Sequence, residues 1–373
     1  MTFSIRHIVG VTTRITRNGF LGTKDPLFGK GWKSVTIAGQ WTLDDVYTYT
    51  IGCHVGHTTE FAVALLAYVL FFGDGSWQTE CATLRAGWVG RVLAFHLACE
   101  VVFVGFWHWL TYCSTFAKRL LPFKYNPKNQ YEPTAYEAGG ARVGMTSSST
   151  GHLQREVFYT TLGWLQSGLW QVAMMRAWAS GALPVAPVFA DRLALNLLGL
   201  HCVTYWREVH FYFAHRGMHP WWNMRNGLLD GDVGAFLYRH AHSLHHKSTN
   251  PGPWSGLSMH PIEHFLYYSC AWLLPLVFTV HPMHFLYAKY HADISPIGGH
   301  DGIDEPSCKG DFHWLHHHKF ECNYGVPFPI NFDRIFGTWC EYDDFKANGG
   351  KLPKANADKI RGLRDAAKSG KAM

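Results

Sequence analysis

The sequence predicts an all-α membrane protein, in which about four transmembrane or re-entrant helices support a cytosolic helical cap that carries clustered histidines. Apolar segments alternate with histidine-rich and charged segments along the 373 residues, although the mean hydropathy of the whole chain is only −0.08. No alternation of strand-like and helix-like segments indicates a parallel sheet. A soluble helical bundle with an aromatic core is the alternative fold.

Five apolar segments define the predicted helices. None is a continuous run of about 20 uncharged residues, the length that crosses a membrane as a helix. The last segment contains Pro275 and Pro282, where helix kinks are expected because proline cannot donate the helical hydrogen bond. In chain order, the segments cover residues 61–73, 92–112, 157–178, 193–206 and 265–290.

The chain divides into three predicted parts. Residues 1–58 form an N-terminal peripheral segment, residues 59–345 a membrane domain, and residues 346–373 a basic C-terminal tail. Within the membrane domain, residues 118–152 are rich in Pro, Gly, Ser and Asn and predict a linker. The tail either lies in solvent or contacts anionic lipid headgroups. Nucleic acid is not an expected partner, because no base-stacking or groove-reading module accompanies the tail.

The nine cysteines form no Cys-x-x-Cys pair and no regular framework, and several lie inside apolar segments. This distribution is typical of a reducing compartment or a membrane interior. Residues 1–30 contain no continuous apolar stretch, so no secretory signal peptide is expected.

Histidines are concentrated in one part of the chain: 18 of the 24 lie between His201 and His318. They form three motifs, each of which follows an apolar segment. Spacings of three and four residues place side chains on one face of a helix, so each motif can direct its rings at one point. The motif residues are His215 and His219, then His242, His245 and His246, then His313, His316 and His317.

Eight imidazole nitrogens exceed the four ligands of one tetrahedral zinc ion, so the motifs predict two metal ions. Carboxylates, which supply half of the ligands in soluble di-iron bundles, are scarce near the motifs. A nearly all-imidazole site leaves the metals strongly cationic, with open positions for dioxygen. This favours oxidation of an unactivated C–H bond, although hydrolysis is not excluded. A histidine-lined metal transporter is the alternative from another class, but it would need ligands at mid-membrane depth.

The motifs and their flanks resemble the three histidine boxes of the fatty acid hydroxylase and sterol desaturase superfamily. The first, second and third boxes correspond by resemblance to residues 206–219, 238–246 and 313–317, respectively. The family's closing motif resembles residues 323–325 and 332–338. Order, spacing and flanks agree over roughly residues 120–345. The resemblance implies that residues 59–345 are the catalytic domain of an integral membrane, dioxygen-dependent, non-haem di-iron oxidase that acts on a lipid.

The resemblance implies two further metal ligands, His260 after the second box and His300 before the third. It also implies two iron ions, for which zinc can substitute, together with O2. Electrons would come from a separate protein such as cytochrome b5 or a ferredoxin, because no His-Pro-Gly-Gly haem-binding segment is present. The expected location is the endoplasmic reticulum of a eukaryote or the inner membrane of a bacterium. The boxes and both termini are expected to face the cytosol, because both terminal segments are basic.

A sterol is the favoured substrate, because Met259-His260-Pro261 resembles sterol desaturases and tryptophans flank the boxes. Fatty acyl chains, sphingolipids and carotenoids remain the alternative substrates. The residues distinguish neither hydroxylation from desaturation nor one oligomeric state from another.

Overall fold

The computed structural model describes residues 57–120, 124–125, 149–221, 232–303, 311–326, 330, 332–340 and 342. The predicted N-terminal segment, apart from its last two residues, and the basic tail lie outside these ranges. Within the described ranges the chain is helical, with one isolated bridge between Lys124 and Ile303 and no strand. The predicted all-α class is therefore confirmed for this part of the chain.

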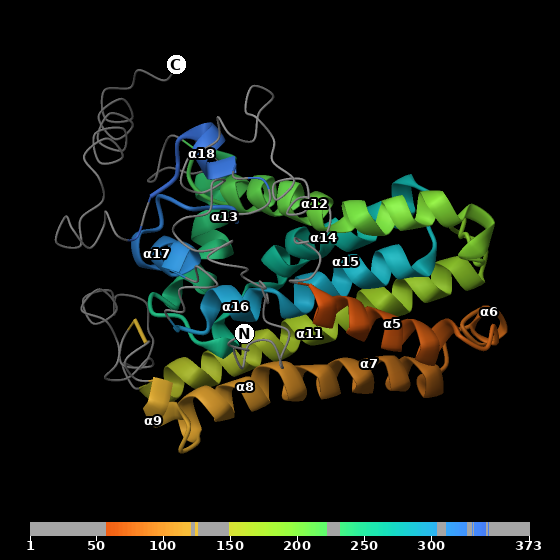
Figure 1. The fold of residues 1–373 in the computed structure, drawn as a ribbon, viewed down its shortest axis with the longest axis horizontal. Coiled ribbons are helices and arrows are strands. Elements are labelled where there is room, and N and C mark those ends of the chain that lie inside the picture. Colours follow the sequence, from red (N-terminus) through yellow and green to blue (C-terminus); the bar gives the residue numbers. More distant parts are fainter. Residues whose placement is uncertain are drawn as a thin grey trace, which may run out of the picture.

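The longer helices run side by side along the long axis of the molecule (Figure 1). They are α5 (Thr58–Phe72), α7 (Ala86–Glu100), α11 (Ser149–Ala179), α12 (Leu193–Gly217), α14 (Pro261–Val277) and α15 (Pro282–Ile294). Helix α7 continues without a break through η3 (Val101–Gly105), α8 (Phe106–His108) and η4 (Trp109–Cys113), of which η3 and η4 are π-helical.

Short elements gather at the end of the bundle where α12 ends (Figure 1). They include α9 (Ala117–Leu120), α13 (Val233–His240), η8 (His242–Lys247), η9 (Pro253–Ser255), α16 (Pro296–His300), α17 (Asp311–Lys319) and α18 (Phe332–Phe336). Helix α6 (Trp77–Glu80) lies at the opposite end, and the short turn η6 (Ala190–Arg192) leads into α12.

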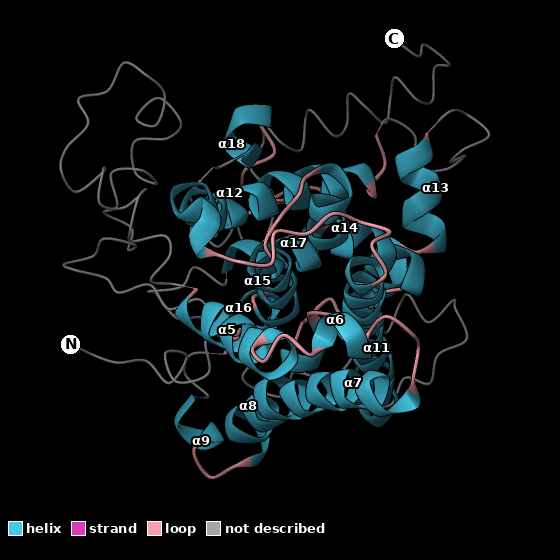
Figure 2. Cartoon of the chain, turned by 90° about the vertical axis from the view of Figure 1, so that its right-hand side faces the viewer, coloured by secondary structure: helices cyan, strands magenta, loops and turns pink. Residues whose placement is uncertain are grey.

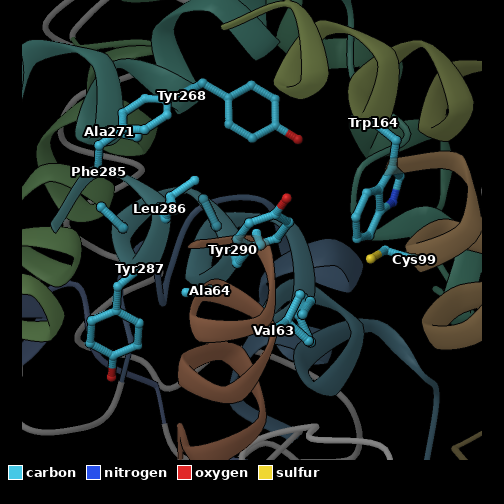
Figure 3. Close-up of a cluster of buried hydrophobic side chains, with 14 of the residues drawn as sticks. Val63, Ala64, Cys99, Trp164, Tyr268, Ala271, Phe285, Leu286, Tyr287 and Tyr290 are labelled. Carbon is cyan, nitrogen blue, oxygen red and sulfur yellow. The ribbon is translucent and has the colours of Figure 1, made fainter. Parts of the chain in front are cut away.

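Helix α15 is the centre of the bundle, because all 13 of its residues are buried. It packs against α5, α11, α12 and α14, and the end-on view of Figure 2 shows it surrounded by these helices. Figure 3 shows Leu286 and Tyr290 of α15 among Ala64 of α5, Trp164 of α11 and Tyr268 of α14. Although it is buried on every side, α15 is not wholly apolar, because it contains Lys289 and Asp293, which form an ion pair at 2.9 Å inside the bundle.

The predicted apolar segment 265–290 is not one kinked helix, because α14 ends at Val277 and α15 begins at Pro282. Both helices start with His-Pro. In each case the histidine ring accepts a hydrogen bond from the backbone N–H two residues later, from Ile262 to His260 and from Met283 to His281, both at 3.2 Å. Proline fits the first helical position because the N–H that it lacks would have no partner inside the helix.

By length and apolar composition, one helix in the described ranges can cross a membrane, the continuous stretch Ala86–Cys113. Thr58–Phe72 is apolar but shorter. The predicted number of about four crossing or re-entrant helices stays a prediction. The linker predicted at 118–152 is shorter at both ends, because α9 reaches Leu120 and α11 begins at Ser149.

Candidate metal centre

The histidine motifs converge at the end of the bundle where α12 ends. The first motif lies on the last turn of α12 and just beyond it, the second on η8, and the third on α17, while His300 is the last residue of α16. Nine of the ten predicted ligands form two groups, in each of which the candidate ligand atoms lie within 4.8 Å of one another. The first cluster consists of His215, His219, His242, His246 and His316, and the second cluster of His245, His300, His313 and His317.

Two of the motifs are divided between the clusters. His245 belongs to the second cluster, although the other two histidines of its motif belong to the first. His316 belongs to the first cluster, whereas His313 and His317 on either side belong to the second. Both η8 and α17 therefore reach both clusters, which fixes the two sites relative to each other.

His242 lies at the centre of the first cluster. Its Nε2 atom lies 3.1 Å from Nε2 of His215, 3.0 Å from that of His219 and 2.9 Å from that of His246. Imidazole nitrogens that bind one ion at about 2.1 Å and are separated by about 90° lie about 3 Å apart. The spacing of these nitrogens therefore fits a shared ion.

His300 occupies the equivalent position in the second cluster. Its Nε2 atom lies 3.1 Å from Nε2 of His313, 3.0 Å from that of His317 and 3.3 Å from that of His245. These distances again match several imidazoles on one ion. The structure thus places His300 with motif histidines, and its role as a ligand stays a prediction.

Backbone carbonyls orient several of the rings. Nδ1–H of His215 donates to the Tyr324 carbonyl at 2.5 Å, and that of His316 to the Cys322 carbonyl at 2.6 Å. In the second cluster, Nδ1–H of His300 donates to the Pro296 carbonyl at 2.7 Å. Because a carbonyl only accepts, each bond places the proton on Nδ1 and leaves the Nε2 lone pair facing the cluster, as a metal-binding histidine requires.

His316 supplies a further test of whether a metal fits. Its Nε2 atom is buried and has no hydrogen-bond partner among the described residues, while Nδ1 is bonded as above. A buried polar nitrogen without a partner costs free energy unless a ligand satisfies it. A metal ion in the first cluster would satisfy it, so the residues of this cluster fit a metal ion.

Glu263 is a site residue that the sequence did not identify. Its carboxylate accepts a hydrogen bond from Nδ1–H of His242 at 2.6 Å, and both side chains are only 1% exposed. Such a carboxylate fixes the tautomer of a metal-binding histidine and makes it a better electron donor. Glu263 follows His242 by 21 residues on another helix, so no local spacing signals their contact.

The closing motif positions the loop that holds two of the rings. The Asp333 carboxylate accepts hydrogen bonds from the backbone N–H of Tyr324 at 2.8 Å and of Gly325 at 2.7 Å, and from the Thr338 hydroxyl at 2.6 Å. Tyr324 in turn offers its carbonyl to His215. The motif therefore acts on the metal site through the backbone and contributes no residue to either cluster.

Burial keeps the clustered histidines neutral. It lowers the pKa of His300 to about 4 and that of His242 to about 3. For His317, burial followed by the neighbouring histidines lowers the pKa far below its ordinary value. Neutral imidazole is the form that binds a metal, so the fold prepares these rings for ligation.

His260 is the one predicted ligand outside both clusters. Its ring accepts the hydrogen bond from Ile262 that caps α14, and it is half-buried rather than enclosed with the other rings. His210, His264 and His291 also lie outside both clusters. Asp232 belongs to neither cluster and caps α13 by accepting a hydrogen bond from the backbone N–H of Ala235.

A cavity opens beside both clusters. It is lined by His215 and His242 of the first cluster and by His245, His300 and His313 of the second. It extends from the clusters into the bundle, where apolar side chains including Phe211, Ala214, Met259 and Phe312 form much of its wall. A molecule in this cavity would contact the open side of both metal sites.

The comparisons with known proteins agree with the motifs. The fatty acid hydroxylase family model matches residues 200–338. Sphinganine C4-monooxygenase 2 of Arabidopsis thaliana is 30% identical over 151 residues, which cover 37% of this chain and 53% of the relative. Lathosterol oxidase of Rattus norvegicus is 28% identical over 152 residues, with 39% and 46% covered, respectively.

A Delta(7)-sterol 5(6)-desaturase of Gibberella zeae, ERG3A, is 29% identical over 153 residues, which cover 38% of this chain and 40% of the relative. The chain thus spans about half the length of the curated relatives that it matches. No solved structure matches the chain significantly. The matched region contains both histidine clusters in full, from His215 to His317.

Proposed function

We propose that residues 200–338, which match the fatty acid hydroxylase family model, form such a domain, and that the protein is a membrane-bound, dioxygen-dependent di-iron oxidoreductase that hydroxylates or desaturates a lipid. The observation that carries the proposal is the pair of adjacent, buried imidazole clusters. Their nitrogens converge on two points and do not line a path, which favours an enzyme over the metal transporter considered above.

The ligand chemistry supports oxidation over hydrolysis. Both clusters consist of histidines, and Glu263 contacts the first only through the ring of His242. Imidazoles suit iron, zinc and copper, but zinc has no redox chemistry. Two bound iron ions would supply the reduction of O2 and the removal of hydrogen from an unactivated carbon.

The protein's own residues orient the metal-binding rings, keep water from the site and bind the substrate. Nδ1–H donors on His215, His242, His300 and His316 fix the direction of their rings, and burial keeps the site out of water. The cavity beside the clusters holds the substrate chain so that one C–H bond lies near the oxidant, which replaces a random encounter by a fixed geometry.

A membrane location is supported by the outer surface of the bundle. Large apolar side chains are exposed on several helices. In the 28-residue stretch Ala86–Cys113, only 28% of the most apolar 18-residue segment is buried inside the protein. Exposed apolar surface of this extent marks contact with a membrane or with another protein. Examples from four helices are Leu66, Val102, Leu198 and Val277. We place the protein in the endoplasmic reticulum of a eukaryote or in the inner membrane of a bacterium.

Electrons come from a separate protein, with cytochrome b5 or a ferredoxin as the candidates, and the histidine end of the bundle faces the cytosol where such a protein can reach it. The motivation is the basic composition of both terminal segments, which matches the positive-inside rule. Labelling of single cysteines placed at His318 and Lys247 tests this topology. Labelling of the two positions from opposite sides of the membrane would refute it.

A sterol is the favoured substrate, and a sphingoid or fatty acyl lipid or a carotenoid is the alternative. The names of the relatives include both sterol-oxidising enzymes and a sphinganine monooxygenase. The decisive experiment expresses the chain in a host with a defined sterol and acyl pool and measures lipid masses. The proposal predicts a lipid that has gained one oxygen or lost two hydrogens, dependent on O2 and on iron. A lipidome identical to that of a host expressing the His246→Ala variant would refute it.

A further inference from the structure

The cavity continues away from the metals along one face of α12. It is lined by Arg207, Phe211, Ala214 and His215 of this helix and by Met218 directly after its end. Their spacings of three and four residues place them in a single stripe. Arg207 precedes His215 by eight residues, so its backbone lies about 12 Å along the helix from that of the metal-facing residue.

Arg207 brings a buried positive charge to this part of the cavity. It is 5% exposed, and its guanidinium lies 4.9 Å from the ring centre of Phe211 and 4.5 Å from that of Tyr267. A guanidinium has five N–H donors. One of them donates to the Tyr267 hydroxyl, whereas the buried Nε–H has no hydrogen-bond partner among the described residues. Buried donors without acceptors are costly, and a ligand that supplies an acceptor would remove that cost.

Tyr267 is a positioning residue at this point. Its hydroxyl donates to the Ala292 carbonyl at 2.8 Å while it accepts from Arg207. Its one proton is already used, so it ties the guanidinium to the central helix α15 and has no donor left for a ligand.

Glu208 follows Arg207 on α12 and brings a carboxylate to the same cavity. It is also 5% exposed, and its Oε2 atom accepts from the backbone N–H of Ile330 at 3.4 Å. The opposite charges of Arg207 and Glu208 offset each other, so an additional anion would be repelled by the carboxylate as well as attracted by the guanidinium. A hydroxyl group suits this pair better, because it accepts one hydrogen bond and donates another.

We propose that Arg207 and Glu208 bind the hydroxyl group of a neutral lipid whose carbon skeleton lies along Phe211 and Ala214 and ends beside the metal clusters. The proposal rests on the proposed function and narrows its substrate class to lipid alcohols, such as sterols or long-chain bases. Free fatty acids and acyl thioesters are excluded by it. The site of oxidation on the substrate is then set by the fixed separation between Arg207 and the clusters along α12.

The test measures equilibrium binding to the iron-loaded full chain in nanodiscs. The probes are two matched pairs, a radiolabelled 3-hydroxysterol with the hydrocarbon that lacks its hydroxyl group and a long-chain alcohol with the corresponding alkane, together with oleate as an anionic lipid. The wild type should bind the alcohol of at least one pair about 10- to 100-fold more tightly than its hydrocarbon, as expected for a hydrogen bond to a charged group. Arg207→Leu should remove most of that preference and leave binding of the hydrocarbon unchanged.

Three further measurements complete the test. Arg207→Gln, which keeps donors but loses the charge, should retain part of the preference and provides a result if the leucine variant does not fold. Arg192→Gln is the matched control, because Arg192 is an exposed arginine at the start of the same helix. Iron content should equal that of the wild type in all variants, which shows that the clusters are intact.

The outcomes separate this proposal from the function on which it rests. No preference for either alcohol, a preference that survives Arg207→Leu, or Arg207-dependent binding of oleate that exceeds binding of the alcohols would overturn the hydroxyl site. An enzyme that oxidises lipids but shows one of these results keeps its function and loses this site. Conversely, an Arg207-dependent preference in a protein that oxidises no lipid would support the site and refute the proposed function.

Discussion

The Glu263 carboxylate accepts a hydrogen bond from Nδ1–H of His242 at 2.6 Å, and His242 is the ring on which three other nitrogens of the first cluster converge. One carboxylate on α14 thus orients the central ligand of a metal site built from α12, η8 and α17. Because Glu263 is 1% exposed, water cannot readily replace it.

Replacement of Glu263 should therefore weaken metal binding in two steps. Glu263→Gln keeps an acceptor for Nδ1–H of His242 but loses the charge, and Glu263→Ala loses both. We expect affinity to fall in the order wild type, Gln, Ala, with the alanine variant about 10- to 100-fold weaker than the wild type. Competition with a calibrated chelator measures this order. Equal affinity in the wild type and Glu263→Ala would contradict it.

Asp333→Asn should loosen the loop that orients His215. The asparagine NH2 group would face one of the backbone N–H donors of Tyr324 and Gly325, so at least one of the hydrogen bonds is lost. We expect lower metal affinity and a lower melting temperature, measured by metal titration and by thermal unfolding. The exposed Asp191 serves as a control, and Asp191→Asn should change neither property. A normal metal affinity in Asp333→Asn would show that the loop does not act on the site.

Two glycines near the first cluster should respond oppositely to alanine. A Cβ atom at Gly234 would lie 2.1 Å from the His219 carbonyl oxygen, whereas a Cβ atom at Gly217 would meet nothing within 4 Å. Gly234→Ala must therefore displace His219 or α13, and we expect a loss of about 1 to 3 kcal/mol of stability together with weaker metal binding. Gly217→Ala should be neutral or stabilise by up to about 1 kcal/mol, because alanine favours helix over glycine. Equal melting temperatures of the two variants would refute this account of the packing.

The metal-free protein should lose stability as the pH falls below about 6.5. The unfolded chain binds protons on its histidines near that pH, whereas burial holds the pKa of folded His300 at about 4 and of His242 at about 3. The unfolded state then binds more protons, so the free energy of unfolding decreases with falling pH down to about pH 4. Denaturant unfolding of the chelator-treated protein between pH 8 and pH 5 measures this slope. A free energy of unfolding that stays constant or rises as the pH falls would contradict it.

The sequence was most informative where a local pattern determines a local structure. Spacings of three and four residues predicted that each motif directs its rings at one point, and this holds for the pairs four residues apart, such as His215 with His219 and His313 with His317. Resemblance to a known family added His300, which no spacing connects to the other rings.

The same patterns could not assign His245 and His316 to their clusters. That assignment depends on how η8 and α17 meet in space, which sequence spacing does not contain. His260 shows that a resemblance can also mislead. Its His-Pro sequence resembles a ligand motif, but in the structure its ring caps α14 and lies outside both clusters. The helix boundaries between α14 and α15 were also missed, because the connecting residues are nearly as apolar as the helices themselves.

Metal stoichiometry in paired histidine variants tests the central claim, two ions held by interleaved motifs, most directly. The number of iron ions bound per chain would be measured at the iron concentration that just saturates the wild type. We predict two ions for the wild type. His246→Ala with His316→Ala removes two ligands of the first cluster and should leave one ion, although these residues lie on different elements. His316→Ala with His317→Ala alters adjacent residues and should leave none, because each belongs to a different cluster. A single ion in the wild type, or equal loss in both double variants, would contradict the account.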